Sequence, residues 1–318
     1  MPYPLYIGPA VLALLVSLRL GWAWALLSLG ALVLLGTVVM GLPMSQEPVL
    51  LPSDTAKTPV VRLMTYNIKS YRANTNDEGY TLLAEEIAQH EPDVLVMQDA
   101  RDLPLRGLPP EMKAVLKEHK HQYGFGQYMV VSRHPLRGCA PGDISFRSRK
   151  STYVHCVLQV NGSEADLVVA HFITPREGLN AARNEQLAGI DDWKQNFADR
   201  MEQSTRLAAD LVRVDRPVIV AGDLNAPEHS PVVRQLLDTG LRDAFSTAGE
   251  GYGYSVGHAL RPHVSLLRID HILVTPLIGV ARCVTGGKEA SEHRPVIADL
   301  VLPPAAPTTG KVSDKKKG

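Results

Sequence analysis

At residues 217–227 the chain reads PVIVAGDLNAP, an apolar run followed by a glycine and polar residues. Its apolar run from Val218 to Ala221 is typical of a central β-strand covered on both faces, and Gly222 allows a tight turn where that strand ends. Alternate residues of an extended segment point the same way, so Asp223 and Asn225 can address one point in space. Such a pair can bind a hard cation and a phosphate oxygen, although Asp and Asn are also common turn formers.

Four other segments combine an apolar strand with polar residues that can bind metal or phosphate. Three of them begin at Val61, Pro92 and Leu267 and read VRLMTYNI, PDVLVMQD and LRIDHILV. The fourth begins at Ser291 and reads SEHRPVIADL, with its polar residues before the strand. Each string is short, but five strings in a fixed order across one domain form a specific signal.

Taken in this order, the five segments resemble the endonuclease/exonuclease/phosphatase superfamily, which has the fold of deoxyribonuclease I. The likeness extends from about Val61 to Leu302. It implies an α+β fold in which two packed, mainly antiparallel sheets form a β-sandwich flanked by helices. It also implies a metal-dependent phosphoesterase that hydrolyses a phosphodiester or phosphomonoester by in-line attack of an activated water.

The resemblance further implies roles for single residues. Asn67, Asp99 and Glu292 would bind the divalent ion, Mg²⁺ or Mn²⁺. His293 would act as the base or stabilise the transition state, and Asp270 would orient its ring. A histidine suits this task because it titrates near neutral pH.

Four other positions would act on the substrate or the water. Asp223 would align the nucleophilic water, and Asn225 would donate its amide to the phosphate. His171, in the segment LVVAHF that begins at Leu167, would contact the scissile phosphate. Arg133, in the SRHP turn that begins at Ser132, would approach the substrate.

Two motifs depart from the family's pattern. The family's Gln-Glu pair stands here as Gln98-Asp99, and its Ser-Asp-His stands as Ser291-Glu292-His293. One carboxylate is therefore a methylene shorter and the other a methylene longer. If both face one metal, the reciprocal change could preserve the distance across the site while shifting the ion. Metal affinity and ion preference become open questions, because Mg²⁺ tolerates little departure from octahedral geometry at about 2.1 Å.

Each of these residues also has a structural explanation. A lone histidine at a strand end, such as His171, is more often structural than catalytic. Asp270 lies close to Arg268 and could form a plain ion pair, and Arg133 could belong to a turn with no chemical role. The remaining candidates without motif support are loop or core histidines, namely His258, His263 and His271.

The N-terminal region is strongly apolar. From Leu5 to Leu42 the only charged side chain is Arg19. Leu20 to Leu42 exceeds the roughly 20 apolar residues that span a bilayer, and Leu5 to Leu18 could complete a tight helical hairpin. A cleavable signal peptide is the competing interpretation, but the stretch is too long and no A-x-A-like site follows. We therefore predict a membrane anchor and, since positive residues favour the cytoplasmic side, an extracytoplasmic catalytic domain.

The rest of the chain divides into three parts. A Pro-rich stretch at residues 43–60 predicts a semi-rigid linker, and residues 303–318 predict a disordered tail. Residues 61–302 between them suffice for one large domain. Within it, Thr81 to His90 and Ala182 to Leu211 have helical periodicity. The apolar stripes expected to pack on the sheets contain Leu83 and Ile87 in the first helix, and Leu187, Ile190, Trp193, Phe197 and Leu207 in the second.

The charge bears on whether nucleic acid is a partner, and the cysteine content bears on whether disulfides stabilise the fold. All 33 acidic residues follow Leu42, whereas Arg19 alone of the 33 basic residues precedes it, so the remainder is close to neutral. A dedicated duplex-DNA binder usually carries a basic stripe, which makes a nucleic-acid substrate less favoured. The odd set of Cys139, Cys156 and Cys283 has no paired spacing, so no disulfide framework is expected.

Three functions remain open at this level. The phosphate-ester substrate could be a nucleic acid or nucleotide, or else a phospholipid or inositol phosphate, which the predicted anchor would favour. The third possibility is a catalytically silent module that binds a phosphate ligand with the same fold. No obligate protein partner is inferred. Substrate choice is expected to depend on loops such as 101–122 and 249–266, which the sequence does not decode.

Overall fold

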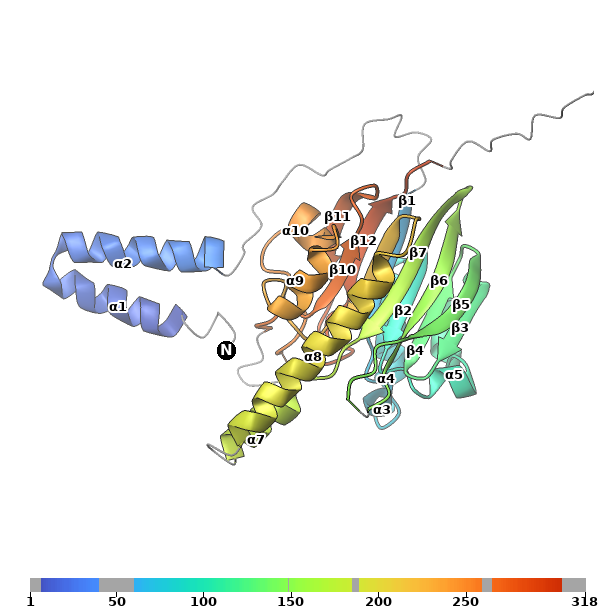
Figure 1. Ribbon diagram of the computed structural model, residues 1–318, viewed down its shortest axis with the longest axis horizontal. Helices are drawn as coiled ribbons and strands as arrows, with labels where there is room; N and C mark the ends of the chain where they lie inside the picture. Colours follow the sequence, from blue (N-terminus) through green and yellow to red (C-terminus); the bar gives the residue numbers. More distant parts are fainter. Residues whose placement is uncertain (1–6, 40–59, 148, 185–188, 259–264, 305–318) are drawn as a thin grey trace, which may run out of the picture.

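The computed structural model describes residues 7–39, 60–147, 149–184, 189–258 and 265–304. Two sheets pack face to face, and helices cover the outer face of each (Figure 1). The α+β sandwich predicted from the five strand segments is thereby confirmed. The predicted linker lies outside the described residues except for Val60, and the predicted tail lies outside them except for residues 303–304.

Each sheet has six strands and a mainly antiparallel arrangement. In spatial order, the first sheet contains β11 (Gly279–Thr285), β12 (Val296–Val301), β1 (Val60–Asn67), β2 (Val94–Gln98), β4 (Tyr128–Ser132) and β3 (His121–Phe125). The second sheet contains β5 (Leu136–Asp143), β6 (Thr152–Val160), β7 (Ser163–His171), β8 (Val218–Asp223), β10 (Asp270–Val274) and β9 (Arg242–Asp243). The parallel pairs are β1 with β2 and β7 with β8.

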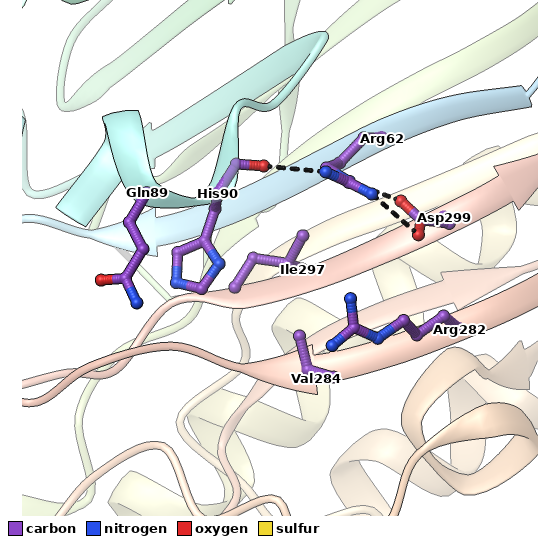
Figure 2. A pocket seen from close by; sticks show the side chains of 7 residues that line it. All are labelled: Arg62, Gln89, His90, Arg282, Val284, Ile297 and Asp299. Carbon is purple, nitrogen blue, oxygen red and sulfur yellow. Dashed lines mark hydrogen bonds and ion pairs between the residues drawn. The ribbon is translucent and has the colours of Figure 1, made fainter.

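The outer face of the first sheet carries an ion pair between neighbouring strands. Arg62 of β1 lies opposite Asp299 of β12 in the register, and its guanidinium donates from Nε to Asp299 Oδ1 at 2.6 Å. A second guanidinium nitrogen donates to the carbonyl of His90 at 3.2 Å. Figure 2 shows these contacts beside a pocket of about 80 Å³. The residues that line it come from β1, β11 and β12 of the sheet and from the end of a helix at Gln89 and His90.

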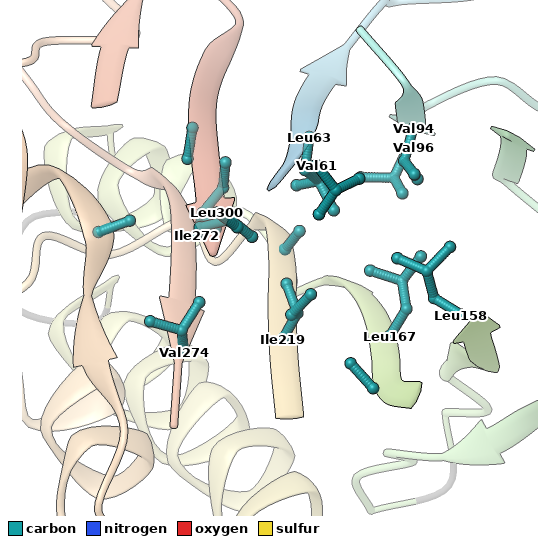
Figure 3. Packing of buried hydrophobic residues seen from close by; sticks show 14 of the residues in the cluster. Val61, Leu63, Val94, Val96, Leu158, Leu167, Ile219, Ile272, Val274 and Leu300 are labelled. Carbon is teal, nitrogen blue, oxygen red and sulfur yellow. The ribbon is translucent and has the colours of Figure 1, made fainter. Parts of the chain in front are cut away.

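The main core lies between the two sheets. Alternate residues of β1 and β2, such as Val61 and Val96, face Leu167 of β7 and Ile219 of β8, and all four are fully buried (Figure 3). The same strands bury their other face beneath helices, so their sequences are apolar almost without interruption. The uninterrupted run at Val218–Ala221 follows from this double coverage.

Helices cover both outer faces of the sandwich. On the first sheet lie α3 (Ser70–Ala73), α4 (Gly79–His90), α5 (Leu103–Arg106) and α6 (Pro110–Val115), with Leu83 and Ile87 buried in a second apolar cluster. On the second sheet lie α8 (Gly189–Leu211) and α9 (Pro231–Leu237), and α7 (Arg176–Asn184) packs on α8. The short α10 (Ala244–Ala248) packs mainly against β11 and places Ala244 and Phe245 in the core between the sheets. In Figure 1 the long α8 runs along the outer face of this sheet.

The apolar stripe predicted for the second helical region is wrong in part. Trp193 and Phe197 are 45% and 38% exposed, whereas the sheet-facing side of α8 contains polar residues such as Gln203 and Ser204 together with Leu207. Gln203 accepts a hydrogen bond from the backbone of Ile173, and Ser204 donates to the carbonyl of Val232. Buried polar groups are acceptable here because they satisfy the backbone of adjoining loops. Leu187 lies outside the described residues.

The membrane anchor predicted at the N-terminus is contradicted. The apolar stretch forms α1 (Ile7–Leu20), α2 (Trp22–Leu34) and a π-helical turn (Leu35–Val39). Gly21, between the first two, has a φ of 129°, which side-chain-bearing residues rarely adopt. A helix of 14 residues is only about 21 Å long, against about 30 Å of hydrocarbon. Among the described residues, no helix has the length and apolarity needed to cross a bilayer. The extracytoplasmic placement inferred from that anchor is overturned with it.

The cysteine prediction also needs correction. Cys139 of β5 and Cys156 of β6 form a disulfide, and Cys283 is free and buried. The register of β5 against β6 shifts between Arg137 and Ala140, which brings the two sulfur atoms together. Linear spacing did not reveal the pair because a cross-strand bond depends on register.

Gly222 is expected to be intolerant of any side chain. Its φ is 152°, and a Cβ at this position would lie 1.9 Å from the carbonyl oxygen of Ala170 on the adjacent strand. Gly222→Ala should therefore destabilise the fold by about 2 kcal/mol or more, measured by urea unfolding. Gly138→Ala is the control, because Gly138 also has positive φ but no atom within 4 Å of a new Cβ. An equal loss in both variants would show that the contact with Ala170 has no effect.

Candidate active site

The strand ends gather polar side chains at one end of both sheets. Asn67 ends β1, His171 ends β7, and Asp223 ends β8. Asp270 begins β10, which is antiparallel to β8, so the register places it opposite Asp223. His171 is the partner of Asp223 on the other side. The sandwich thus brings residues more than 200 positions apart into one cluster.

His293 and Asp270 form a buried pair. The ring Nδ1 of His293 lies 2.9 Å from Asp270 Oδ2, and both side chains are almost fully buried. Ser255 donates its hydroxyl to the same carboxylate oxygen at 2.6 Å and accepts from the backbone N–H of Asp270. Asp270 therefore fixes the ring through Nδ1 and leaves Nε2 facing the cluster.

Asp223 is the centre of the cluster. Its Oδ2 accepts a hydrogen bond from Asn67 Nδ2 at 2.9 Å, and it lies 3.4 Å from His171 Nε2 and 3.8 Å from His293 Nε2. Its Oδ1 accepts from the backbone N–H of Asn225 at 2.9 Å. A single carboxylate therefore contacts groups from both sheets and both histidines.

Asn225 sits in a constrained loop after β8. Its φ is 49°, in the left-handed region that Asn tolerates better than most residues. Its Nδ2 donates to the carbonyl of Phe172 at 2.8 Å. The backbone carbonyl of Asn225 accepts a hydrogen bond from Arg200 of α8 at 3.0 Å. One amide hydrogen of Asn225 remains for another acceptor.

The two carboxylates that depart from the family's pattern are paired with cations. Lys69 Nζ lies 2.6 Å from Asp99 Oδ2, and Arg72 lies 2.7 Å from Glu292 Oε1. The Lys69 and Asp99 side chains are 17% and 13% exposed, whereas Arg72 is 57% exposed. Asp99 Oδ1 lies 3.9 Å from His171 Nδ1, which connects this pair to the cluster.

Electrostatic coupling shifts the protonation of the cluster. Burial alone would raise the pKa of Asp223, but the two histidines and Lys69 hold it well below its usual value. Burial would also raise the pKa of Asp99, and His171 and Lys69 lower it. Burial alone would lower the pKa of His293, yet the carboxylates of Asp270 and Asp223 raise it above 6.5. Charged carboxylates and a basic imidazole therefore stabilise one another here.

The sequence profile of the endonuclease/exonuclease/phosphatase family matches residues 64–293, most of the chain. The chain belongs to this family. No curated protein sequence gave a significant match.

Several solved structures from the family share the fold. An endonuclease/exonuclease/phosphatase from Beutenbergia cavernae is 21% identical with a TM-score of 0.58, covering 78% of this chain and 72% of that one. A 3′ phosphatase from Neisseria bound to a product DNA hairpin is 19% identical with a TM-score of 0.53, covering 75% and 98%. Sphingomyelinase C from Streptomyces griseocarneus is 20% identical with a TM-score of 0.52, covering 76% and 99%. At these identities the likeness shows the fold alone.

Divalent-metal chemistry characterises the family, and the donor set of this site fits it. Among the described residues, the ligand atoms of Asp223, Asp270 and His293 lie within 4.8 Å of one another and could hold an ion. Asp270 Oδ1 is buried and has no hydrogen-bond partner, so it is an oxygen that could accept a cation. The metal ligands predicted from the sequence differ from this group, because Asp99 and Glu292 contact Lys69 and Arg72 instead.

The structure does not bring Arg133 to the cluster. Arg133 follows β4, whose last residue pairs with Val94 at the start of β2, so it lies at the opposite end of the sheet from Asp99. There it pairs with Asp93 at 3.0 Å and lines a shallow pocket with Arg62. The SRHP turn therefore carries an ion pair away from the candidate site.

Sequence reasoning missed several residues that contact the site. Lys69 and Arg72 follow the TYNI motif directly, and Ser255 lies in a loop that carries no motif. Gln127 Oε1 accepts a hydrogen bond from His171 Nδ1 at 2.9 Å. The nearness of Lys69 to Asn67 in sequence was the one signal that could have shown its position. His271, left as a core histidine, is buried between Asp243 and the carbonyl of Ala226.

Proposed function

We propose that this protein is a divalent-metal-dependent phosphoesterase that hydrolyses a phosphodiester or phosphomonoester by in-line attack of water. The observation that carries the proposal is the buried His293–Asp270 pair whose free ring nitrogen faces Asp223. A structural histidine would satisfy both ring nitrogens within the core, as His271 does. The imidazole of His293 instead directs one nitrogen at a cluster of polar strand ends.

Each side chain has a task that its contacts support. Asp223 is held ionised and accepts hydrogen bonds, so it would align a water molecule for attack. His293, oriented by Asp270, would take a proton from that water or donate one to a phosphoryl oxygen at Nε2. The spare amide hydrogen of Asn225 and the ring of His171 would contact the phosphate.

A divalent ion, Mg²⁺ or Mn²⁺, would polarise a phosphoryl oxygen and neutralise the developing charge. The resemblance assigns it to Asn67, Asp99 and Glu292, which are hard oxygen donors of the type that both ions prefer. Each carboxylate of that set would have to share or release its present cation, Lys69 or Arg72.

The test is a hydrolysis screen of the full chain with Mg²⁺ or Mn²⁺. Its substrates are single- and double-stranded DNA, RNA, nucleotides, phospholipids and inositol phosphates, with released phosphate or product as the readout. We expect turnover on at least one class that EDTA abolishes and either metal restores. Asp223→Asn and His293→Ala serve as inactive controls. Turnover that is unaffected by EDTA would contradict the metal requirement.

One observation favours a second candidate, a catalytically silent module that binds a phosphate ligand. Lys69 and Arg72 occupy the carboxylates that the family uses for metal, and cations in that position could bind phosphate directly. Inactivity of the wild type on every substrate and with both metals, combined with retained binding of a phosphate ester, would favour this candidate.

The exchanged carboxylates lead to a prediction about coupling. Because Asp99 is short and Glu292 is long, restoring the family pattern at one position should disturb Mg²⁺ binding more than restoring both. The measurement is a double-mutant cycle on Mg²⁺ affinity with Asp99→Glu, Glu292→Asp and the double variant. We expect a coupling of about 1 kcal/mol or more, as is usual for residues that share a site. Additive effects would remove the case for compensation between the two residues.

A further inference from the structure

Lys69 and Asp99 are held against each other by their backbones. Both residues have left-handed conformations, with φ of 46° and 48°, which are uncommon for residues other than glycine. The backbone N–H of Ile68 donates to the carbonyl of Gln98, and that of Ser70 donates to the carbonyl of Asp99. The ends of β1 and β2 are thus tied together on both sides of Lys69. Its ion pair follows from backbone geometry and does not depend on a flexible surface contact.

The ammonium of Lys69 contacts an oxygen that a metal would need. Asp99 Oδ2 lies 2.6 Å from Nζ, and Asp99 Oδ1 faces His171 at 3.9 Å. Both partners are largely buried, so solvent screens the interaction weakly. Arg72 makes a similar contact with Glu292, but its exposed guanidinium can leave at little cost. Lys69 is therefore the cation that opposes a second positive charge at this edge.

Asp99 is one of the two positions where the motifs of this chain differ from the pattern that the resemblance implies. A glutamate there would extend one methylene further into the site. With aspartate, the carboxylate stays near the backbone of β2, where Lys69 reaches it. The short side chain of Asp99 and its ion pair with Lys69 therefore place an ammonium where a divalent ion would otherwise contact the carboxylate.

We propose that Lys69 is an internal cation that competes with the divalent ion for Asp99 and so sets the metal affinity of this site. The inference rests on the proposed function only in placing a metal at Asp99. Metal binding displaces the ammonium from Asp99 Oδ2, and removal of the ammonium strengthens metal binding. In the absence of metal, Lys69 keeps the buried Asp99 neutralised.

The experiment measures Mn²⁺ binding to the full chain by calorimetry and by electron paramagnetic resonance of free Mn²⁺. Lys69→Met removes the charge and keeps most of the side-chain length, and we expect it to lower the dissociation constant about 10-fold or more, since a unit charge a few ångströms away repels a divalent ion. Lys69→Arg keeps the charge and should stay within about threefold of the wild type. Lys113→Met, at an exposed position on α6, changes the net charge equally and should leave affinity unchanged.

A further variant locates the ion. Asp99→Asn should weaken Mn²⁺ binding, and the same substitution should abolish the gain that Lys69→Met produces. Unchanged or weaker Mn²⁺ binding in a folded Lys69→Met variant would overturn the proposal, as would unchanged binding in Asp99→Asn. Thermal unfolding of each variant shows whether it is folded, and Lys69→Gln removes the same charge if the methionine variant does not fold. Hydrolysis by the wild type is scored separately, so an inactive protein that shows the Lys69 effect would refute only the proposed function.

Discussion

Replacing His293 with alanine is expected to lower turnover by about 10²- to 10⁴-fold, the usual contribution of a positioned acid or base. The reason is that His293 directs Nε2 at Asp223 while its other ring nitrogen is held by Asp270. The measurement is steady-state kinetics on the substrate found in the screen. KM should change little, because the metal and Asn225 would still hold the phosphate.

Asp270→Asn should have an effect of similar size, and combining it with His293→Ala should add little. The two residues act as a unit, and removing either member of such a unit leaves little for the other to do. Ser255 would still bond to the residue at 270, so the loop is expected to remain in place. Fully multiplicative losses in the double variant would contradict the orienting role of Asp270.

His121→Ala is the control for the kinetics. His121 lies on the edge strand β3, away from the cluster, and its removal should leave turnover within twofold of the wild type. Thermal unfolding separates a loss of chemistry from a loss of fold. Near-normal turnover in a folded His293→Ala variant would sink the proposed mechanism.

Asp243→Asn is expected to destabilise the protein by about 2 kcal/mol or more, because it removes one of the two carboxylates that pair with the largely buried Arg268, the other being Glu228. Asp243 Oδ1 lies 2.7 Å from Arg268 Nη1, and Asp243 Oδ2 lies 2.7 Å from His271 Nδ1. The same carboxylate accepts from the backbone N–H groups of Phe245 and Ser246 at the start of α10. The variant would disturb both the ion pair and the helix cap, and urea unfolding measures the loss.

The stability of the wild type should also depend on pH through Asp243. Burial alone would raise the pKa of Asp243, but Arg268 and His271 hold it well below 3.8. A depressed pKa in the folded state stabilises the fold above the unfolded value near pH 4, and the contribution is lost as the pH falls toward the folded value. Between about pH 5 and pH 2 the wild type should therefore lose more stability than Asp243→Asn.

The exposed Asp238 provides the matched control for both measurements. Asp238→Asn should change stability by less than about 0.5 kcal/mol and leave the pH dependence as in the wild type. Parallel pH profiles for the wild type and Asp243→Asn would show that the Asp243 carboxylate does not contribute in the way its contacts indicate.

The five strand segments that carry the motifs could be predicted because both the core and the polar ends leave local signals. Val218–Ala221 is apolar without interruption, since β8 is buried on both faces, and Asp223 follows where the strand must turn. The helix at Gly79–His90 was equally visible through Leu83 and Ile87. Such signals need only a few neighbouring residues, so a single sequence carries them.

Other features depend on contacts between distant residues, and these the sequence did not reveal. The disulfide between Cys139 and Cys156 requires a register shift, and Arg133 turned out to lie at the far end of its sheet. The apolar N-terminal stretch was long enough to span a bilayer, but its described residues form helices of 14 and 13 residues and a π-helical turn of five. The ion pair of Lys69 with Asp99 depends on two left-handed residues 30 positions apart. Composition and periodicity do not predict such contacts, because these signals come from residues close together in sequence.

The hydrogen bond from Asn67 to Asp223 joins the two sheets at the site itself. Its donor belongs to one layer of the sandwich and its acceptor to the other, so neither layer contains a complete set of functional groups. A chimera that exchanges one whole sheet with that of a relative would need side chains at its strand ends that pair with those of the retained sheet. Good packing between the sheets would not be sufficient. Substitutions on the outer surface of either sheet leave this contact intact. Substitutions at the strand ends that carry Asn67 and Asp223 must instead be compatible with each other.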